Sequence, residues 1–362
     1  MAERRVIETA TLLMLLALLA VPIAWALPPA LALDGVALWT TVSLAALAPA
    51  STAWLVGAAV LTPAALDAGD RTGQRDIAAA ITASVLISAF VAARLTPGIA
   101  WIGGAFFTLR HLHVVGDWWM GRLAAPRLRA HLRYQLFLPV MFTGPIHRIQ
   151  TFERQALRRR WGAQEFFDGL ERSLLGALSA FVVGGWLVRR AGGVLMRGTS
   201  DFPAFAREWM YSAIDWVALY FVFAGLTSVA LGIALMIGLK LEENFNRPWE
   251  ARNLLDFWLR WHMSLTSWCR DYVFRPVMAL TRSALAGLIA AMLAIGLWHE
   301  FSLYYVLWSI WQVLGIVITR ATLRYVPVGS CPKWLRASGG PLIVLGWLSA
   351  ARPVCSRLLE LL

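Results

Sequence analysis

The sequence has few charged residues for its length, and this scarcity argues against a water-soluble surface. Charged residues make up 15% of the 362 residues, whereas soluble domains average about 25%. The hydrophobic fraction is 59%, and the apolar residues occur in long runs. A membrane-spanning helix needs a run of about 20 apolar residues, and lipid admits only helices or closed barrels. Because the runs are far longer than barrel strands, we expect an all-α integral membrane protein.

Cysteine and lysine are also scarce. Cys269, Cys331 and Cys355 form no CxxC pair and no metal-ligand spacing, which gives no sign of a disulfide framework or a zinc cluster. Lysine occurs only at Lys240 and Lys333, so arginine supplies nearly all of the cations behind the net charge of +12. The arginines lie in loops between apolar runs, where the positive-inside rule and anionic headgroups explain them. We therefore expect membrane lipids and no nucleic acid as partners.

The apolar windows predict a bundle of about 8–11 membrane helices and re-entrant segments. The segment from Thr9 to Leu27 is expected to be a retained first helix, with a signal peptide cleaved near Ala24-Trp25-Ala26 as the alternative. Pro139, Gly144 and Pro145 interrupt one window, which is typical of a buried re-entrant segment. The further windows are 36–62, 77–95, 99–115, 134–146, 173–188, 213–239, 284–298, 302–320 and 340–350. We find no repeat or linker, so residues 1–362 are expected to form a single membrane domain.

Basic residues indicate the orientation of the chain in the membrane. Nine arginines and one acidic residue, Glu153, lie between Arg122 and Arg160, and a second basic stretch runs from Arg247 to Arg275. Both stretches are expected on the cytoplasmic side, together with Met1. Arg189, Arg190 and Arg197 do not fit this pattern neatly, so the number of crossings between the two stretches stays open.

The stretch from Glu242 to Pro276 carries an unusual mixture of tryptophans with charged and hydroxyl residues. Each charge at membrane depth costs about 2.5 kcal/mol or more, so a plain membrane helix would not carry this load. A segment that lies at the interface, or that dips into a polar cavity, would accommodate both the tryptophans and the charged residues. If the stretch is helical, Trp258, Trp261, Leu265 and Trp268 share one face and Arg260, Ser264 and Ser267 share another. His262 then lies between the two faces.

A second polar feature ends the apolar run 284–297, where Trp298, His299 and Glu300 follow one another. Histidine titrates near neutral pH and is well suited to accept a proton there. Glu300 could orient the imidazole or pair with an arginine, although adjacent helical residues do not face each other. The simpler alternative is a histidine at a helix end that reaches the headgroups, and the residues alone leave both interpretations open.

Two other features are weaker candidates for chemistry. His111 and His113 are two residues apart, so on a helix they point to different sides, and no carboxylate or cysteine cluster accompanies them. We therefore predict no metal site. Cys269 has no neighbour in sequence that would activate its thiol as an acyl-enzyme nucleophile.

An ordered set of motifs runs along the chain between Phe137 and His299. The motifs are Phe137-Leu-Pro139, Gly144-Pro145, Arg148, Phe223-Ala-Gly225, Asn244-Phe-Asn246, Pro248, Phe257-Trp258, Arg260-Trp-His-Met-Ser264, Trp268, Arg270-Asp-Tyr272 and Gly296-Leu-Trp-His299. In this order they resemble the membrane-bound O-acyltransferase (MBOAT) superfamily, and in particular its bacterial branch of alginate O-acetyltransferases and teichoic-acid D-alanyl transfer proteins. The resemblance covers roughly residues 105–320, between N-terminal helices in 1–104 and a C-terminal segment in 321–362.

This resemblance implies helices around a funnel or tunnel and the transfer of an acyl group, expected to be acetyl, from a thioester to a hydroxyl. The donor would be acyl-CoA or an acyl-carrier protein at the cytoplasmic face, with no permanently bound cofactor. The acceptor would be an exported polysaccharide, a cell-envelope glycan or an acyl-relay protein outside a bacterial inner membrane. His299 matches the invariant histidine, a candidate general base, and His262 matches the second position. Other candidates near the substrates are Trp298, Asn246, Arg260, Trp261, Ser264, Trp268, Arg270, Asp271 and Glu300.

Two other functions stay open at this point. A multi-pass transporter or flippase could use the same polar cavity, but it would favour paired inverted halves, which we do not detect. A non-catalytic membrane scaffold is the other alternative. Its best support is Glu300, because bacterial members of the resembled superfamily usually have glycine after the histidine.

Overall fold

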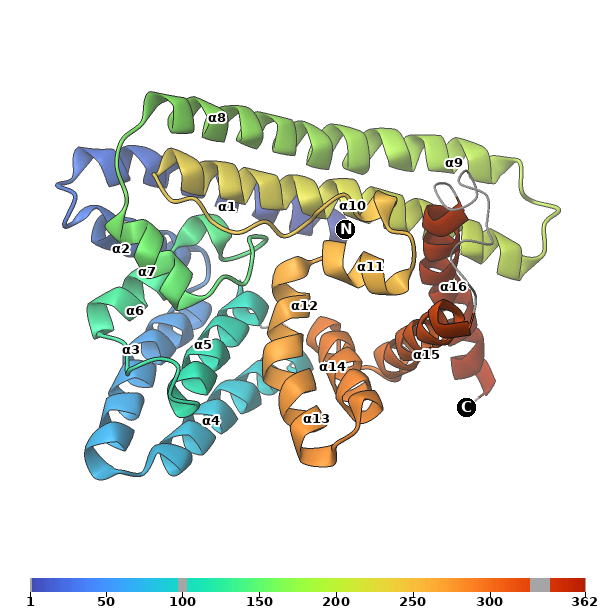
Figure 1. Cartoon of the computed structure of the whole chain (residues 1–362). Helices are drawn as coiled ribbons and strands as arrows, with labels where there is room; N and C mark the ends of the chain where they lie inside the picture. The colour runs from blue at the N-terminus through green and yellow to red at the C-terminus, as the bar shows by residue number, and fades with distance from the viewer. Residues whose placement is uncertain (1, 97–102, 326–338, 362) are drawn as a thin grey trace. The chain divides into compact units, whose positions relative to one another are not determined.

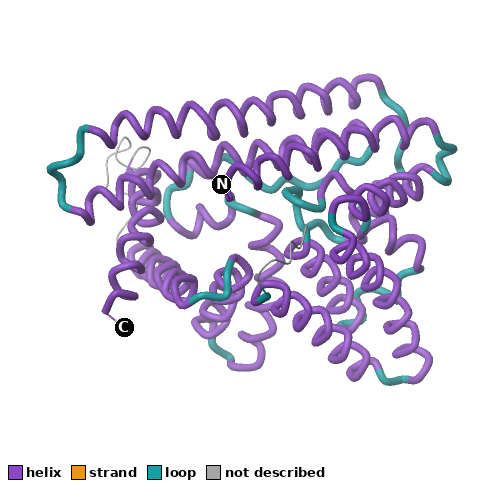
Figure 2. The backbone as a smooth tube through the Cα atoms, turned by 180° about the vertical axis from the view of Figure 1, so that it is seen from behind, coloured by secondary structure: helices purple, strands orange, loops and turns teal. Residues whose placement is uncertain are grey.

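The computed structural model describes residues 2–96, 103–325 and 339–361, with side chains from residue 11 onward. The regular elements of this described part are helices joined by loops, with no strand among them (Figures 1 and 2). Six helical segments are long and apolar enough to cross a membrane: Pro49–Thr72, Arg75–Leu95, Ala163–Arg197, Ala204–Met236, Leu303–Tyr325 and Gly340–Leu361. Three shorter apolar helices accompany them: Thr11–Ala26, Ala32–Leu47 and Ala284–His299. The prediction of an all-α, multi-pass membrane protein is confirmed.

The chain divides into two compact units, of which the first comprises Met1–Gly176 and Leu226–Glu242. The prediction of a single domain is not tested by this division. The helices of the first unit are α1 (Ala2–Ala26), α2 (Ala32–Leu47), α3 (Pro49–Thr72), α4 (Arg75–Leu95), α5 (Gly104–Trp119), α6 (Leu128–Gln135), the short 3₁₀ helix η1 (Leu138–Val140), α7 (Ile149–Leu157) and most of α8 (Ala163–Ala177).

The second unit comprises Ala177–Gly225 and Glu243–Leu362. Helix α10 (Ala204–Met236) begins in this unit and ends in the first. The other helices of the second unit are the π-helical η2 (Leu178–Val188), α9 (Arg189–Arg197), the 3₁₀ helix η3 (Pro248–Glu250), α11 (Leu254–Arg260), α12 (Met263–Cys269), the π-helical η4 (Arg270–Phe274), α13 (Arg275–Thr281), α14 (Ala284–His299), α15 (Leu303–Tyr325) and α16 (Gly340–Leu361).

Prolines explain where the helices depart from the expected windows. The window 36–62 is divided between α2 and α3 because Ala48 leaves helical geometry and Pro49, which has no N–H to donate, begins the next helix. The interrupted window 134–146 contains the end of α6, η1 and irregular chain, and its residues 134–141 are all buried. Irregular backbone in that window, predicted from its prolines and glycine, is confirmed.

Glycines let the segment Ala163–Arg197 approach α10 closely (Figure 1). In the first unit a Cβ on Gly169 would lie 2.6 Å from the backbone oxygen of Gly232. In the second unit a Cβ on Gly184 would lie 2.9 Å from the backbone oxygen of Ala218. Membrane helices pack through such small residues because lipid supplies no hydrophobic force between them.

Arg159 joins the end of α1 to the end of α10 within the first unit. Its Nε donates to the carbonyl of Ile237 at 2.8 Å and its Nη2 donates to the carbonyl of Ala24 at 2.5 Å. The guanidinium lies 3.9 Å from the ring centroid of Trp25, whose Nε1 donates to the carbonyl of Met236 at 2.9 Å. Helix ends leave carbonyls without partners, and one arginine therefore satisfies two of them.

We expect Arg159→Gln to lower the unfolding free energy by about 1.5–3 kcal/mol, because hydrogen bonds from a charged donor are lost. The measurement is the thermal unfolding midpoint of the purified protein in detergent. The matched control is Arg158→Gln, which removes the same charge from an exposed neighbour and should change the free energy by less than about 0.5 kcal/mol. Equal shifts in the two variants would contradict this role for Arg159.

Candidate functional site

A break between two short helices places His262 inside the second unit. Helix α11 begins at Leu254, where the Asn253 side chain accepts from the Asp256 N–H at 2.9 Å, and it ends at Arg260. Trp261 is extended, and His262 has a left-handed backbone with φ of 43°. Helix α12 then begins at Met263. The condition on which the two faces depended, a helix through the whole stretch, is therefore not met, and neither face extends across the break.

Asn244 holds the break in place from 18 residues earlier in the chain. Its side-chain Oδ1 accepts from the Ser264 hydroxyl at 2.8 Å and from the Ser264 N–H at 3.2 Å. Its carbonyl accepts from the Met263 N–H at 2.8 Å. Asn244 is fully buried. The first N–H groups of a helix have no partner within the helix, and here Asn244 accepts hydrogen bonds from two of them. These bonds also fix the position of His262, which directly precedes α12.

His262 is 3% exposed and is surrounded by aromatic rings. Its ring meets Phe223 edge-on at a centroid distance of 4.9 Å and Trp298 at 5.8 Å. Trp298 in turn meets His299 at 4.9 Å. Burial, and after it the charge that His299 would carry, lower the pKa of His262 to about 3. His262 is therefore neutral at physiological pH.

Close packing of α14 against α15 positions His299. Helix α14 begins after Ser283, whose hydroxyl accepts from the Ala286 N–H at 3.2 Å. A Cβ on Gly296 would collide with the Ser309 hydroxyl and lie 2.7 Å from the Tyr305 carbonyl. The helix ends at His299 because Glu300 is extended. The histidine therefore lies where α14 meets the first turns of α15.

Two aromatic residues of α15 flank His299. Tyr305 is stacked on the imidazole with a centroid distance of 5.7 Å and an interplanar angle of 18°, and Trp308 meets it edge-on at 6.2 Å. The His299 side chain is exposed. The two rings limit the orientations of the imidazole while the residue stays accessible.

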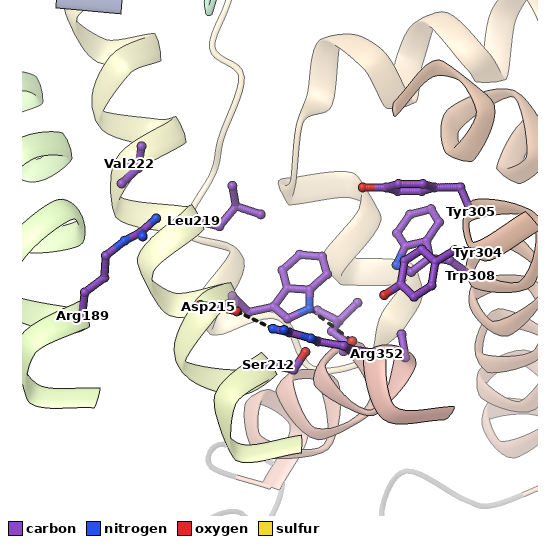
Figure 3. Close-up of a pocket in the computed structure, with 12 residues that line it drawn as sticks. Arg189, Ser212, Asp215, Leu219, Val222, Tyr304, Tyr305, Trp308 and Arg352 are labelled. Carbon is purple, nitrogen blue, oxygen red and sulfur yellow. Dashed lines mark hydrogen bonds and ion pairs between the residues drawn. The ribbon is translucent and has the colours of Figure 1, made fainter. Parts of the chain in front are cut away.

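Tyr305 and Trp308 also line a cavity of about 490 Å³ within the second unit. Figure 3 shows Tyr304, Tyr305 and Trp308 of α15 along one wall, and the Asp215–Arg352 ion pair across the cavity. The size falls in the range of about 300–1,000 Å³ that is usual for ligand sites. The lining residues are Arg189, Ser212, Asp215, Trp216, Leu219, Val222, Tyr304, Tyr305, Trp308, Leu348, Ala351 and Arg352.

The structure brings only some of the predicted site residues together. His262, Trp298 and His299 form one chain of ring contacts. Trp261 stacks on Phe257 at 5.5 Å and meets the cavity residue Trp216 at 5.3 Å.

The other candidates support the backbone or lie at the surface. Ser264 bonds to Asn244, and Trp268 packs against Tyr272 at 5.1 Å. Ion pairs link Arg260 to Asp256 at 2.7 Å, Arg270 to Asp271 at 3.1 Å and Arg275 to Asp271 at 3.0 Å. Asn246 and Glu300 are exposed.

Sequence reasoning missed Asn244, Tyr305 and Trp308. Asn244 lies in the motif Asn244-Phe-Asn246, but nothing in the motif tells which asparagine turns inward. Tyr305 and Trp308 are three residues apart at the start of an apolar helix, so they share a face. That spacing was the available signal, although it could not reveal that the face meets His299.

The histidines of the first unit lie in its interior. His111, His113, His131 and His147 are all fully buried. His113 pairs with Asp117 at 3.3 Å, and its Nε2 accepts from the Ile149 N–H at 3.0 Å, so both ring nitrogens are engaged. Burial lowers the pKa of His131 and of His147 well below the usual value. Among the described residues, no group of three or more His, Cys, Asp or Glu side chains could hold a metal ion.

The fold and this site define a multi-pass helical membrane protein with a histidine exposed at the end of an apolar helix. Residues 122–341 match the family model described as MBOAT, membrane-bound O-acyltransferase family. The chain belongs to this family, as its motifs predicted.

Several curated relatives resemble the chain. The probable alginate O-acetylase AlgI of Azotobacter vinelandii is 29% identical over 255 residues, which cover 68% of this chain and 50% of that protein. The teichoic acid D-alanyltransferase of Streptococcus thermophilus is 31% identical over 245 residues, covering 62% and 57%. The peptidoglycan O-acetyltransferase of Helicobacter pylori is 33% identical over 121 residues, covering 33% and 23%. The chain thus spans about half the length of the first two relatives.

We expect Asn244→Leu to destabilise the protein by about 1–3 kcal/mol, because buried donors of Ser264 lose their acceptor. The thermal unfolding midpoint in detergent measures the change. The matched control is Asn246→Leu, since that side chain is exposed and its backbone bonds to Arg260 are kept. If Asn246→Leu destabilised the protein as much as Asn244→Leu did, the conclusion that Asn244 stabilises the break between α11 and α12 would be wrong.

A second prediction follows from the low pKa of His262. An unfolded chain binds a proton at this residue below about pH 6.5, whereas the folded chain does so only near pH 3. The stability contributed by neutral His262 is therefore fully present above pH 6.5 and is lost as the pH falls toward 3. We expect His262→Asn, which tolerates the left-handed backbone, to show a flatter decline of the unfolding midpoint between pH 7 and pH 4.5. Parallel declines in the two proteins would refute the assignment.

Proposed function

We propose that the chain is an O-acyltransferase that moves an acyl group, in the first instance acetyl, from a thioester to a hydroxyl of an exported glycan, with His299 as general base. The observation that carries the proposal is the placement of His299. In a chain of the MBOAT family, this exposed imidazole ends an apolar helix and is flanked by two rings that also line a cavity.

The chemistry needs one proton transfer near neutral pH. As the acceptor oxygen attacks the thioester carbonyl, a carbon–oxygen bond forms and His299 takes the hydroxyl proton. The carbon–sulfur bond then breaks, and the departing thiolate takes up the proton from His299, which returns the imidazole to its neutral form. Tyr305 stacks on His299 and Trp308 meets it edge-on, so both limit its orientations, and oriented groups can lower such a barrier by several kcal/mol.

His262 serves as a neutral partner in this proposal. Its low pKa prevents it from acting as a charged acid at physiological pH. A neutral imidazole still offers one N–H donor, which could stabilise the oxyanion of the tetrahedral intermediate or orient Trp298, the ring between the two histidines. Substitutions of His262 should therefore lower the rate of acyl transfer less than substitutions of His299.

The substrates are proposed to arrive from opposite sides of the membrane. The donor is acyl-CoA or an acyl-carrier protein at the cytoplasmic face, where basic residues such as the exposed Arg270 would attract its negative charge. The named relatives act on alginate, teichoic acid and peptidoglycan, which supports a cell-envelope glycan or an acyl-relay protein as acceptor. A bacterial inner membrane is the corresponding location.

The test is transfer of a radiolabelled acetyl group from acetyl-CoA, or from acetylated carrier protein, to bacterial glycan fractions by purified protein in lipid nanodiscs. We expect His299→Gln to reduce the rate by about 10²- to 10⁴-fold, the usual contribution of a general base. Because its side chain is exposed, its unfolding midpoint and elution volume should match those of the unaltered protein. Full activity in a folded His299→Gln protein would eliminate this mechanism.

A further inference from the structure

An arginine in the interior of the first unit lacks the partners that a buried charge needs. Arg110 of α5 is fully buried, and none of its three guanidinium nitrogens has a hydrogen-bond partner among the described residues. The guanidinium lies over the ring of Tyr134, 4.3 Å from the ring centroid. A ring face attracts a cation, but it does not neutralise the charge. Because a buried charge is costly unless an opposite charge and hydrogen bonds accompany it, Arg110 requires a compensating negative group.

The carboxylate on the same helix is already engaged by other groups. Asp117 pairs with His113 at 3.3 Å and with Arg122 at 3.8 Å. It also accepts from the Gln150 side chain at 2.9 Å. Within the described ranges, no carboxylate forms an ion pair or a hydrogen bond with Arg110. The described side chains therefore leave the positive charge of Arg110 uncompensated.

Two neutral imidazoles lie close to this charge. His131 and His147 are fully buried, and their rings lie 6.4 Å and 5.2 Å from the same Tyr134 ring. Burial, and after it the charges of His111 and Arg110, lower the pKa of His131 well below its usual value. Burial, and after it the charge of Arg110, has the same effect on the pKa of His147. Both rings are therefore neutral at physiological pH, and they neither add to the charge of Arg110 nor offset it.

The two imidazoles differ in what they offer to a ligand. His147 Nδ1 donates to the Pro145 carbonyl at 3.1 Å, because a carbonyl can only accept, and its Nε2 carries no proton in the neutral ring. Neither ring nitrogen of His131 has a hydrogen-bond partner in the part of the chain that the structure describes, and a neutral imidazole carries one N–H. Buried donors are normally paired, so the N–H groups of His131 and Arg110 indicate an acceptor that is not part of these side chains.

We propose that the interior of the first unit binds a small monovalent anion of the halide class, for which Arg110 supplies the opposite charge and His131 a further N–H. The guanidinium has five N–H donors, and hydrogen bonds between ionised groups are stronger than neutral ones. One negative charge balances the charge of Arg110, whereas a divalent anion would leave a net charge buried. The bound anion stabilises the folded chain.

Enclosure decides the class of the anion. Arg110, His131 and Tyr134 are all fully buried, so a carboxylate or phosphate of a lipid, nucleotide or sugar would need the rest of its molecule to be enclosed as well. A halide has no such remainder, and a spherical ion accepts donors from any direction. His299 and the cavity beside it belong to the second unit, so this anion site is independent of the proposed acyl transfer.

The first test measures the thermal unfolding midpoint of the purified protein in detergent while sodium chloride replaces sodium gluconate at constant ionic strength. Gluconate is too large to be enclosed. We expect the midpoint to rise by about 3 °C or more for a roughly hundredfold increase in chloride, because a ligand that binds only the folded chain stabilises it with the logarithm of its concentration. Bromide should replace chloride. A midpoint that does not respond to either halide would overturn the proposal.

Two variants separate the site from a general effect of salt. Arg110→Met replaces the buried charge by an apolar side chain and should abolish the response to chloride. Arg158→Gln removes an equal charge from an exposed position of the same unit and should keep the full response. Equal responses to chloride in Arg110→Met, Arg158→Gln and the unaltered protein would mean that the anion acts elsewhere, and the assignment to Arg110 would be wrong.

Crystals of the unaltered protein grown in sodium bromide provide a test that does not depend on the folding of Arg110→Met. Anomalous diffraction at the bromine absorption edge locates each bound bromide. We expect a peak in contact with the guanidinium of Arg110 and beside the His131 ring. An ordered water at that place without anomalous signal, or bromide found at other positions alone, would overturn the proposal.

Discussion

The close approach of α14 and α15 at Gly296 is the constraint on which the site depends. A side chain at this position would meet the Ser309 hydroxyl and the Tyr305 carbonyl, so only glycine allows the two helices this separation. The contact brings the end of α14 against the first turns of α15. As a result Tyr305 stacks on His299, and Trp308 meets the imidazole edge-on. The same two rings line the cavity, so a single glycine contact positions the proposed base close to this cavity.

The position of the second histidine, His262, depends on a different set of contacts. His262 occupies a strained left-handed position between two short helices, and such positions persist where surrounding contacts determine them. Here the contacts come from Asn244, which bonds to the first turn of α12. Burial then keeps His262 neutral, whereas His299 remains exposed. The two histidines therefore have different environments, and this difference supports the division of roles that we propose.

Much of the fold could be predicted from the sequence, because a helix that crosses lipid needs a run of about 20 mostly apolar residues. Helices such as Arg75–Leu95 and Leu303–Tyr325 follow directly from their apolar runs. The structure confirms the interruption predicted at Pro139. It also places an interruption at Pro49, within a window that was expected to be one helix. Family membership followed from the order of the motifs. The break at His262 could not be predicted, because it depends on hydrogen bonds to Asn244, which lies 18 residues earlier in the chain. The contact of His299 with Tyr305 was missed for the same reason, since the angle between two helices is not a local property.

Chemical modification of histidine tests the central claim, that His299 is an accessible proton acceptor beside a buried neutral partner. The protein in nanodiscs is treated with diethylpyrocarbonate near pH 7, and carbethoxylation at each histidine is quantified by mass spectrometry alongside residual acyl transfer. The account predicts that His299 is modified in proportion to the loss of activity, while His262 is protected until the protein unfolds. Complete modification of His299 with activity intact, or loss of activity that follows modification of His262 alone, would contradict it.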